Sequence, residues 1–163
     1  MATLYQLLQH AFDIVLLPVS TALQRLSPTA YLAGASFNWQ VGDSVDGEQL
    51  RAQLQAAGYQ AVSQVFAPGE YSIRGNLIDV FPTGSPVPYR LDLCDTTLES
   101  LRTFEVESQR SLEKVSAVRL LPAREFPLDE SGQQCFRQNF RRQFEGDPSK
   151  SALYKAVSSS QAP

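Results

Sequence analysis

The chain has 163 residues, which suits one domain or slightly more, and its 43% hydrophobic and 19% charged residues are typical of a globular protein. The net charge of −3 argues against a dedicated nucleic-acid binder, and the single histidine argues against His-based triads and multi-histidine metal sites. The sequence has no C-x-x-C pair, no phosphate-binding loop and no membrane-length apolar run, so we expect a cytoplasmic protein without cofactor or metal.

The first block, residues 1–28, predicts a fragment of an α/β domain. A short helix is expected near residues 3–9. The apolar run Asp13–Leu17 predicts a strand buried on both faces, and a second helix is expected before Ser27-Pro28. Such strands need parallel neighbours, which so short a block cannot supply. We therefore expect residues 1–28 to be the end of a larger domain.

The second block, residues 29–118, predicts a compact α+β module: a small mixed, largely antiparallel sheet with a packed helix. The helix begins at Asp46, which opens a D-x-x-Q capping box before Leu50 and Leu54, and it ends at Gly58. Strands are expected at residues 37–41, 61–66, 71–74, 77–81, 89–94 and 98–104. Turn residues at 75–76 and 95–96 connect the last four of these strands into two hairpins.

The third block, residues 119–163, predicts mainly helix, with a short strand at its start. A helix is expected at residues 130–144, with Cys135, Phe136, Phe140 and Phe144 on one apolar stripe. The stripe predicts that Cys135 is a core residue. Asp147 begins a last short helix that runs to about residue 157.

Two arginines carry the most information. Arg74 and Arg90 lie on adjacent hairpins, at positions that alternate with the apolar residues, so both are expected to be exposed. Their guanidinium groups suit a carboxylate or phosphate partner, because each offers a rigid fork of donors. The alternative is that they form salt bridges with Asp79 or Asp92.

Three long motifs around these arginines resemble the N-terminal region of bacterial transcription-repair coupling factors (Mfd). They are G-E-[FY]-x-x-R-G-x-[LI]-[LI]-D-[LIV]-F-P at residues 69–82, P-x-R-[LI]-[DE] at 88–92, and S-[LI]-R-x-F-x-x-x-[ST]-Q-R-[ST] at 100–111. The excision-repair protein UvrB has a homologous module, but the last motif resembles the coupling factor instead.

The resemblance implies a piece of a large multi-domain ATPase that displaces stalled RNA polymerase and recruits excision repair. Residues 1–28 would end a UvrB-like domain 1a, residues 29–118 would be an inserted UvrA-binding domain 2, and residues 119–163 would begin the returning domain 1b. ATP, magnesium, polymerase and DNA would be handled by domains absent from this chain. The chain itself would then be a non-enzymatic module whose partners are UvrA and the other domains.

In the family, UvrA is contacted by the arginines that correspond to Arg74 and Arg90 and by an aromatic residue at the position of Cys94. Here Leu93-Cys94 replaces an aromatic pair, which reduces the apolar area. We predict a UvrA-binding site in which the two arginines meet acidic groups and Leu93 and Cys94 form an apolar rim. A UvrB-like DNA-binding fragment and an enzyme with an unrecognised site are the alternatives.

Overall fold

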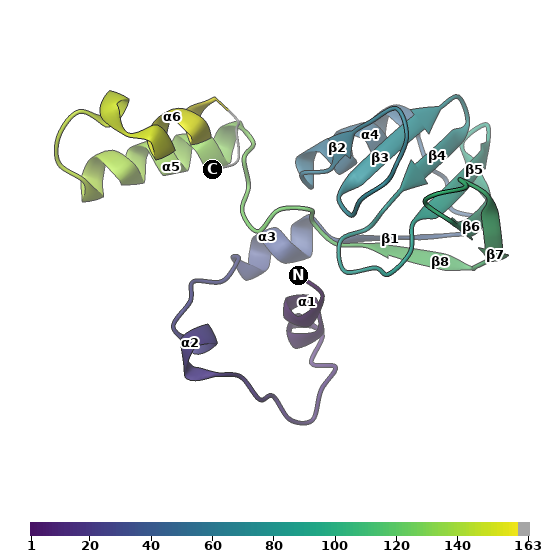
Figure 1. Ribbon diagram of the computed structural model, residues 1–163, viewed down its shortest axis with the longest axis horizontal. Helices are drawn as coiled ribbons and strands as arrows, with labels where there is room; N and C mark the ends of the chain where they lie inside the picture. Colours follow the sequence, from purple (N-terminus) through teal and green to yellow (C-terminus); the bar gives the residue numbers. More distant parts are fainter. Residues whose placement is uncertain (160–163) are drawn as a thin grey trace. The chain divides into compact units, whose positions relative to one another are not determined.

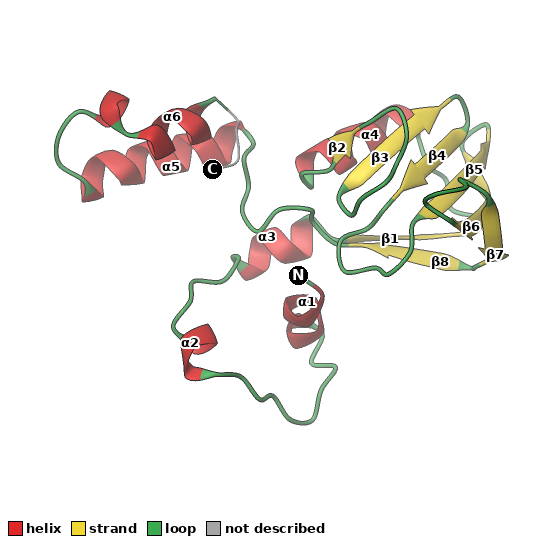
Figure 2. Ribbon diagram, in the orientation of Figure 1, coloured by secondary structure: helices red, strands yellow, loops and turns green. Residues whose placement is uncertain are grey.

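The computed structural model describes residues 1–159, which fall into two units, Met1–Glu125 and the described part of Phe126–Pro163 (Figure 1). The strands belong to the first unit, and the described part of the second unit is helical (Figure 2). None of the helices in residues 1–159 combines the length and apolar character that a bilayer crossing requires.

The first unit is built on a six-stranded sheet in which each strand pairs with the next along the chain. Its strands are β2 (Gln60–Ala61), β3 (Glu70–Arg74), β4 (Leu77–Val80), β5 (Tyr89–Cys94), β6 (Thr97–Phe104) and β7 (Ser111–Lys114). The β2–β3 pair is parallel and the other pairs are antiparallel. Strands β1 (Phe37–Gln40) and β8 (Ala117–Leu120) form a separate antiparallel ribbon. The predicted α+β class is confirmed.

Helix α4 (Gly47–Ala56) forms where the capping signal predicts it. The Asp46 carboxylate accepts hydrogen bonds from the backbone N–H groups of Glu48 and Gln49, at 2.9 and 2.8 Å. Gly58 ends the helical turn with φ +87°, and a Cβ atom there would lie 2.7 Å from the Cγ atom of Arg124. Glycine is therefore required at this position both by its backbone conformation and by the close approach of Arg124.

The main core lies between α4, the β1–β8 ribbon and one face of the six-stranded sheet. Its buried members include Trp39, Leu50, Leu54, Tyr71, Ile78, Val80, Leu91, Leu93, Leu98, Leu101, Val118 and Leu120. Trp39 of β1 belongs to this core and is 7% exposed. Because side chains alternate along a strand, this burial fixes which residues of β3–β6 point away from the core.

The N-terminal segment departs from the prediction. It contains α1 (Ala2–Leu8), α2 (Val19–Ala22) and α3 (Thr29–Gly34), and no strand forms at residues 13–17. Ile14 is 79% exposed and Leu16 is 92% exposed. The prediction of a buried strand is wrong for this chain, because neither of its backbone edges has a neighbouring strand with which to share hydrogen bonds.

Three other elements of the first unit were mispredicted. The strand expected at residues 61–66 is reduced to the two residues of β2, and α3 and β7 were not expected. All four residues of β7 are exposed, so burial imposes no alternating pattern that its sequence could display.

The second unit is a pair of helices, α5 (Glu130–Gln143) and α6 (Ala152–Ser158), separated by a short 3₁₀ turn at Pro148–Lys150. The rings of Phe136 and Phe140 lie 6.1 and 5.1 Å from the ring of Tyr154 on α6. Cys135 is exposed, so its predicted core position is wrong. Phe136 and Phe140 are four residues apart and share a face, whereas Cys135 is rotated away from that line.

Candidate protein-docking surface

The face of the six-stranded sheet that points away from the main core is called the outer face here. It contains two rows of residues paired across neighbouring strands: Ser72, Asp79, Arg90, Arg102 and Lys114 in one row, and Arg74, Leu77, Asp92 and Ser100 in the other. Cys94 continues the outward positions of β5 beyond Asp92. The topology thus brings the predicted residues Arg74, Arg90 and Cys94 onto one surface.

A buried carboxylate organises this face. Asp79 is 1% exposed, and its Oδ2 accepts from Arg74 Nη2 at 2.6 Å. Its Oδ1 accepts from Arg90 Nε at 2.7 Å, and Oδ2 also accepts from Arg90 Nη2 at 2.9 Å. The salt-bridge alternative is therefore correct for both arginines, with Asp79 as the partner. Asp92 is exposed and does not form a salt bridge within residues 1–159.

Arg90 contacts several neighbouring segments, and its side chain is only 15% exposed. Its Nη1 donates to the carbonyl oxygen of Gln109 at 3.0 Å and to Ser111 Oγ at 3.3 Å, and its guanidinium carbon lies 4.7 Å from the centre of the Phe104 ring. The hydrogen bond to Asp79 raises the pKa of Arg90 above its ordinary value. The prediction that Arg90 is exposed is wrong, because segment 104–110 covers it.

Arg74 remains available to a partner. Its side chain is 49% exposed, and Asp79 is its only partner among the described residues. One of its terminal nitrogens is thus anchored, while its other donors make no hydrogen bond within residues 1–159. Tethering a guanidinium group in this way lowers the entropy that it loses when it binds.

The two predicted apolar residues lie on opposite faces of β5. Leu93 is 7% exposed and belongs to the main core, so its predicted place in an exposed rim is wrong. Alternation along the strand explains this, because Leu93 points inward with Leu91. Cys94 is exposed on the outer face. Leu77 is half-buried there and is paired with both Arg74 and Asp92, so it adds an apolar side chain to the outer face.

Gln109 is a further positioning residue that the sequence reasoning did not single out. It has φ +58°, and its Nε2 donates to the carbonyl oxygens of Val65 and Val106 at 3.1 and 2.7 Å. Its own carbonyl oxygen accepts from Arg90. The available signal was its place in the S-Q-R segment of the third motif. Gln109 therefore ties two loops to the arginine.

The same end of the outer face carries a small second core. Phe81 and Phe104 continue the outward positions of Asp79 and Arg102, and they are buried together with Val65. The cluster sits beneath the guanidinium group of Arg90. Packed apolar side chains, rather than water, therefore lie beneath the ion pair of Arg90 and Asp79.

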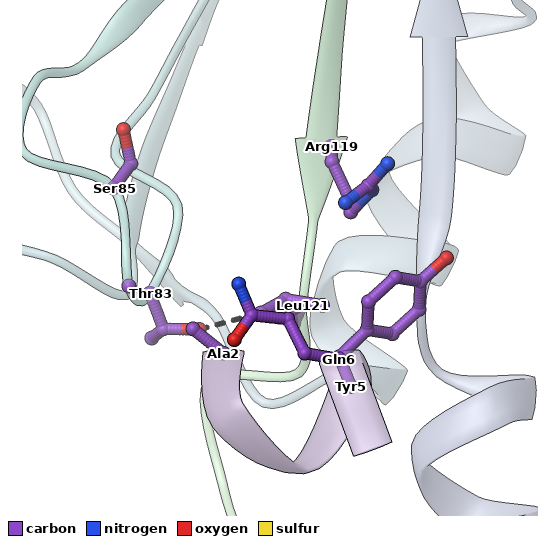
Figure 3. Close-up of a pocket in the computed structure, with 8 residues that line it drawn as sticks. Ala2, Tyr5, Gln6, Thr83, Ser85, Arg119 and Leu121 are labelled. Atoms are coloured by element: carbon purple, nitrogen blue, oxygen red, sulfur yellow. Dashed lines mark hydrogen bonds between the residues drawn. The ribbon is translucent and has the colours of Figure 1, made fainter. Parts of the chain in front are cut away.

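A separate pocket lies between α1, β8 and the loop at residues 82–86 (Figure 3). Its volume is about 190 Å³, and its lining includes Tyr5, Gln6, Thr83, Ser85 and Arg119. The Thr83 hydroxyl already donates to the carbonyl oxygens of Leu121 and Pro122. The guanidinium carbon of Arg119 lies 4.9 Å from the centre of the Tyr5 ring. The pocket brings no nucleophile and base together. Among the described residues, no group of three acidic, cysteine or histidine side chains could hold a metal ion.

Comparisons with known proteins identify the family. Residues 37–126 match the family model described as the UvrB interaction domain. The chain is 43% identical over its whole length to the transcription-repair-coupling factor of Escherichia coli (strain K12), of which it spans 14%. It is 46% identical over 144 residues, 88% of the chain, to that of Haemophilus influenzae, and 38% identical over 112 residues, 69% of the chain, to that of Bacillus subtilis, spanning 13% and 10% of those proteins. The chain belongs to the UvrB interaction domain family, as a segment similar to transcription-repair-coupling factors.

Proposed function

We propose that this chain is the docking module of a transcription-repair coupling factor and that it recruits the repair ATPase UvrA in transcription-coupled excision repair. The observation that carries the proposal is Arg74, half-exposed on the outer face and tethered to the buried carboxylate of Asp79. On this proposal residues 29–118 form the docking domain, and the flanking residues belong to a neighbouring domain of a longer protein. The chain supplies binding, and the ATP-driven motor lies elsewhere.

The docking mechanism rests on charge and preorganisation. Arg74 would donate its free N–H groups to a carboxylate of UvrA, and such charge-assisted hydrogen bonds are about twice as strong as neutral ones. Arg90 does not need to touch UvrA, because it holds Asp79, which in turn holds Arg74. Leu77 and Cys94 would provide the apolar surface beside this contact.

The proposal predicts that Arg74→Ala weakens UvrA binding by about tenfold or more, since a hydrogen bond to a charged group contributes about 1.5–3 kcal/mol. Titration of purified UvrA with the parent chain and the variant, by calorimetry or fluorescence anisotropy, measures the change. The matched control is Arg51→Ala, because Arg51 is exposed on α4, which packs against the opposite face of the sheet. The control is expected to bind as the parent does.

Two outcomes would contradict the proposal. One is UvrA binding that Arg74→Ala leaves unchanged, which would place the contact on another surface. The other is a folded parent that does not bind UvrA but binds DNA with an affinity that falls steeply as the salt concentration rises, as a UvrB-like DNA-binding fragment would. Circular dichroism spectra of both variants establish that each is folded before the titrations are compared.

A further inference from the structure

We infer that Arg102 is a second docking residue of the outer face and that it takes another carboxylate of the same acidic protein partner. The inference rests on the proposed function and extends the docking surface from β3 across the sheet to β6. The observation behind it is the pairing of Arg102 with Arg90 on one side and Lys114 on the other.

Among residues 1–159, no carboxylate forms a salt bridge with Arg102. Directly paired side chains on one face of an antiparallel sheet are close neighbours, so three cations stand side by side on β5, β6 and β7. The nearest acid of that row, Asp79, already accepts from Arg74 and Arg90. Within residues 1–159 the salt bridges are those two, and neither involves Arg102 or Lys114.

The side chain of Arg102 also donates no hydrogen bond to another residue in the described part of the chain. Its Nε atom is buried without a partner, which is costly for a polar group. The residue as a whole is only half-buried, and its terminal nitrogens are not among the buried unpaired atoms of the described chain. An incoming carboxylate can therefore reach the terminal nitrogens and supply the counter-charge that the fold omits.

The chemistry of the face favours an acidic protein over a nucleic acid. Asp92 is exposed in the row beside Arg90 and Arg102. This carboxylate would repel a continuous phosphate backbone, whereas a protein surface can place its own charges around it. Three strand spacings separate β3 from β6, so the two carboxylates of the partner should lie roughly 14 Å apart across the strands.

The test is a UvrA titration of Arg102→Ala and Arg102→Glu beside the parent, Arg74→Ala and the control Arg51→Ala. Arg102→Ala is expected to weaken binding by about tenfold, since a lost charge-assisted contact of about 1.4 kcal/mol corresponds to that factor. Arg102→Glu is expected to weaken it further, because it presents a like charge to the partner. The thermal unfolding midpoint of Arg102→Ala should equal or exceed that of the parent, since the variant removes an unpaired charge.

The outcomes separate this inference from the proposed function. If Arg74→Ala loses affinity while both Arg102 variants bind as the parent does, the inference is overturned and the proposed function stands. If the folded parent does not bind UvrA, both fail together. If Arg102→Ala is destabilised, Arg102→Gln keeps most of the stem and decides the question. In a parallel titration with DNA, Arg102 variants that lose affinity for DNA but keep the parent's affinity for UvrA would also overturn the inference.

Discussion

Replacing Asp79 by alanine is expected to lower the free energy of unfolding by about 3–5 kcal/mol, the range for breaking a buried ion pair by removing one partner. The carboxylate is 1% exposed and is the acceptor for two arginines. Its removal leaves the largely covered guanidinium group of Arg90 without a counter-charge and releases Arg74. Urea unfolding followed by circular dichroism measures the change, and the same variant should bind UvrA more weakly.

The control removes both charges. Asp79→Leu combined with Arg90→Met replaces the buried pair by apolar side chains, which is often neutral or stabilising, so most of the lost stability should return. The single variants Asp79→Leu and Arg90→Met, together with this double variant, form a cycle that isolates the interaction of the pair. If Asp79→Ala unfolds at the urea concentration of the parent, the carboxylate does not organise the outer face and the account of Arg74 fails.

Replacing Phe104 by alanine is expected to cost about 3–5 kcal/mol, as large aromatic truncations in cores do. Phe104 is 1% exposed and packs with Val65 and Phe81. The variant also removes the ring beneath the Arg90 guanidinium group, so Arg90 should become more mobile. Thermal or urea unfolding gives the stability, and hydrogen exchange of segment 104–110 reports the loosened loop.

Two comparisons sharpen that result. Phe104→Leu keeps much of the apolar volume and should cost clearly less than Phe104→Ala. Phe66 is 54% exposed, so Phe66→Ala should change stability by less than about 0.5 kcal/mol. Equal effects of Phe104→Ala and Phe66→Ala would show that the small second core contributes nothing to stability.

Local signals predicted the parts of the fold that local chemistry determines. The cap at Asp46, the glycine at position 58 and the alternation along β3–β6 each depend on residues a few positions apart, and the structure has all three. Of the two roles considered for Arg74 and Arg90, the pairing with Asp79 is confirmed. A role of Arg74 and Cys94 in binding UvrA stays a prediction.

The failures share a different cause, which is dependence on distant segments. Arg90 is covered because segment 104–110 folds over it, and no pattern within β5 contains that information. Residues 13–17 have the composition of a buried strand but no neighbour to pair with, so they remain exposed. Leu93 was assigned to the apolar rim because Leu93-Cys94 replaces an aromatic pair of the family, although its place on β5 points it into the core.

The central claim is that the outer face is the surface that UvrA covers, and Cys94 allows a direct test. Cys94 lies exposed on that face, while Cys135 is exposed on α5 and serves as an internal control. Each thiol of this chain is labelled with iodoacetamide with and without saturating UvrA, and its rate is followed by mass spectrometry. The account predicts slower labelling of Cys94 and an unchanged rate at Cys135. An unchanged rate at Cys94 in the saturated complex would contradict it.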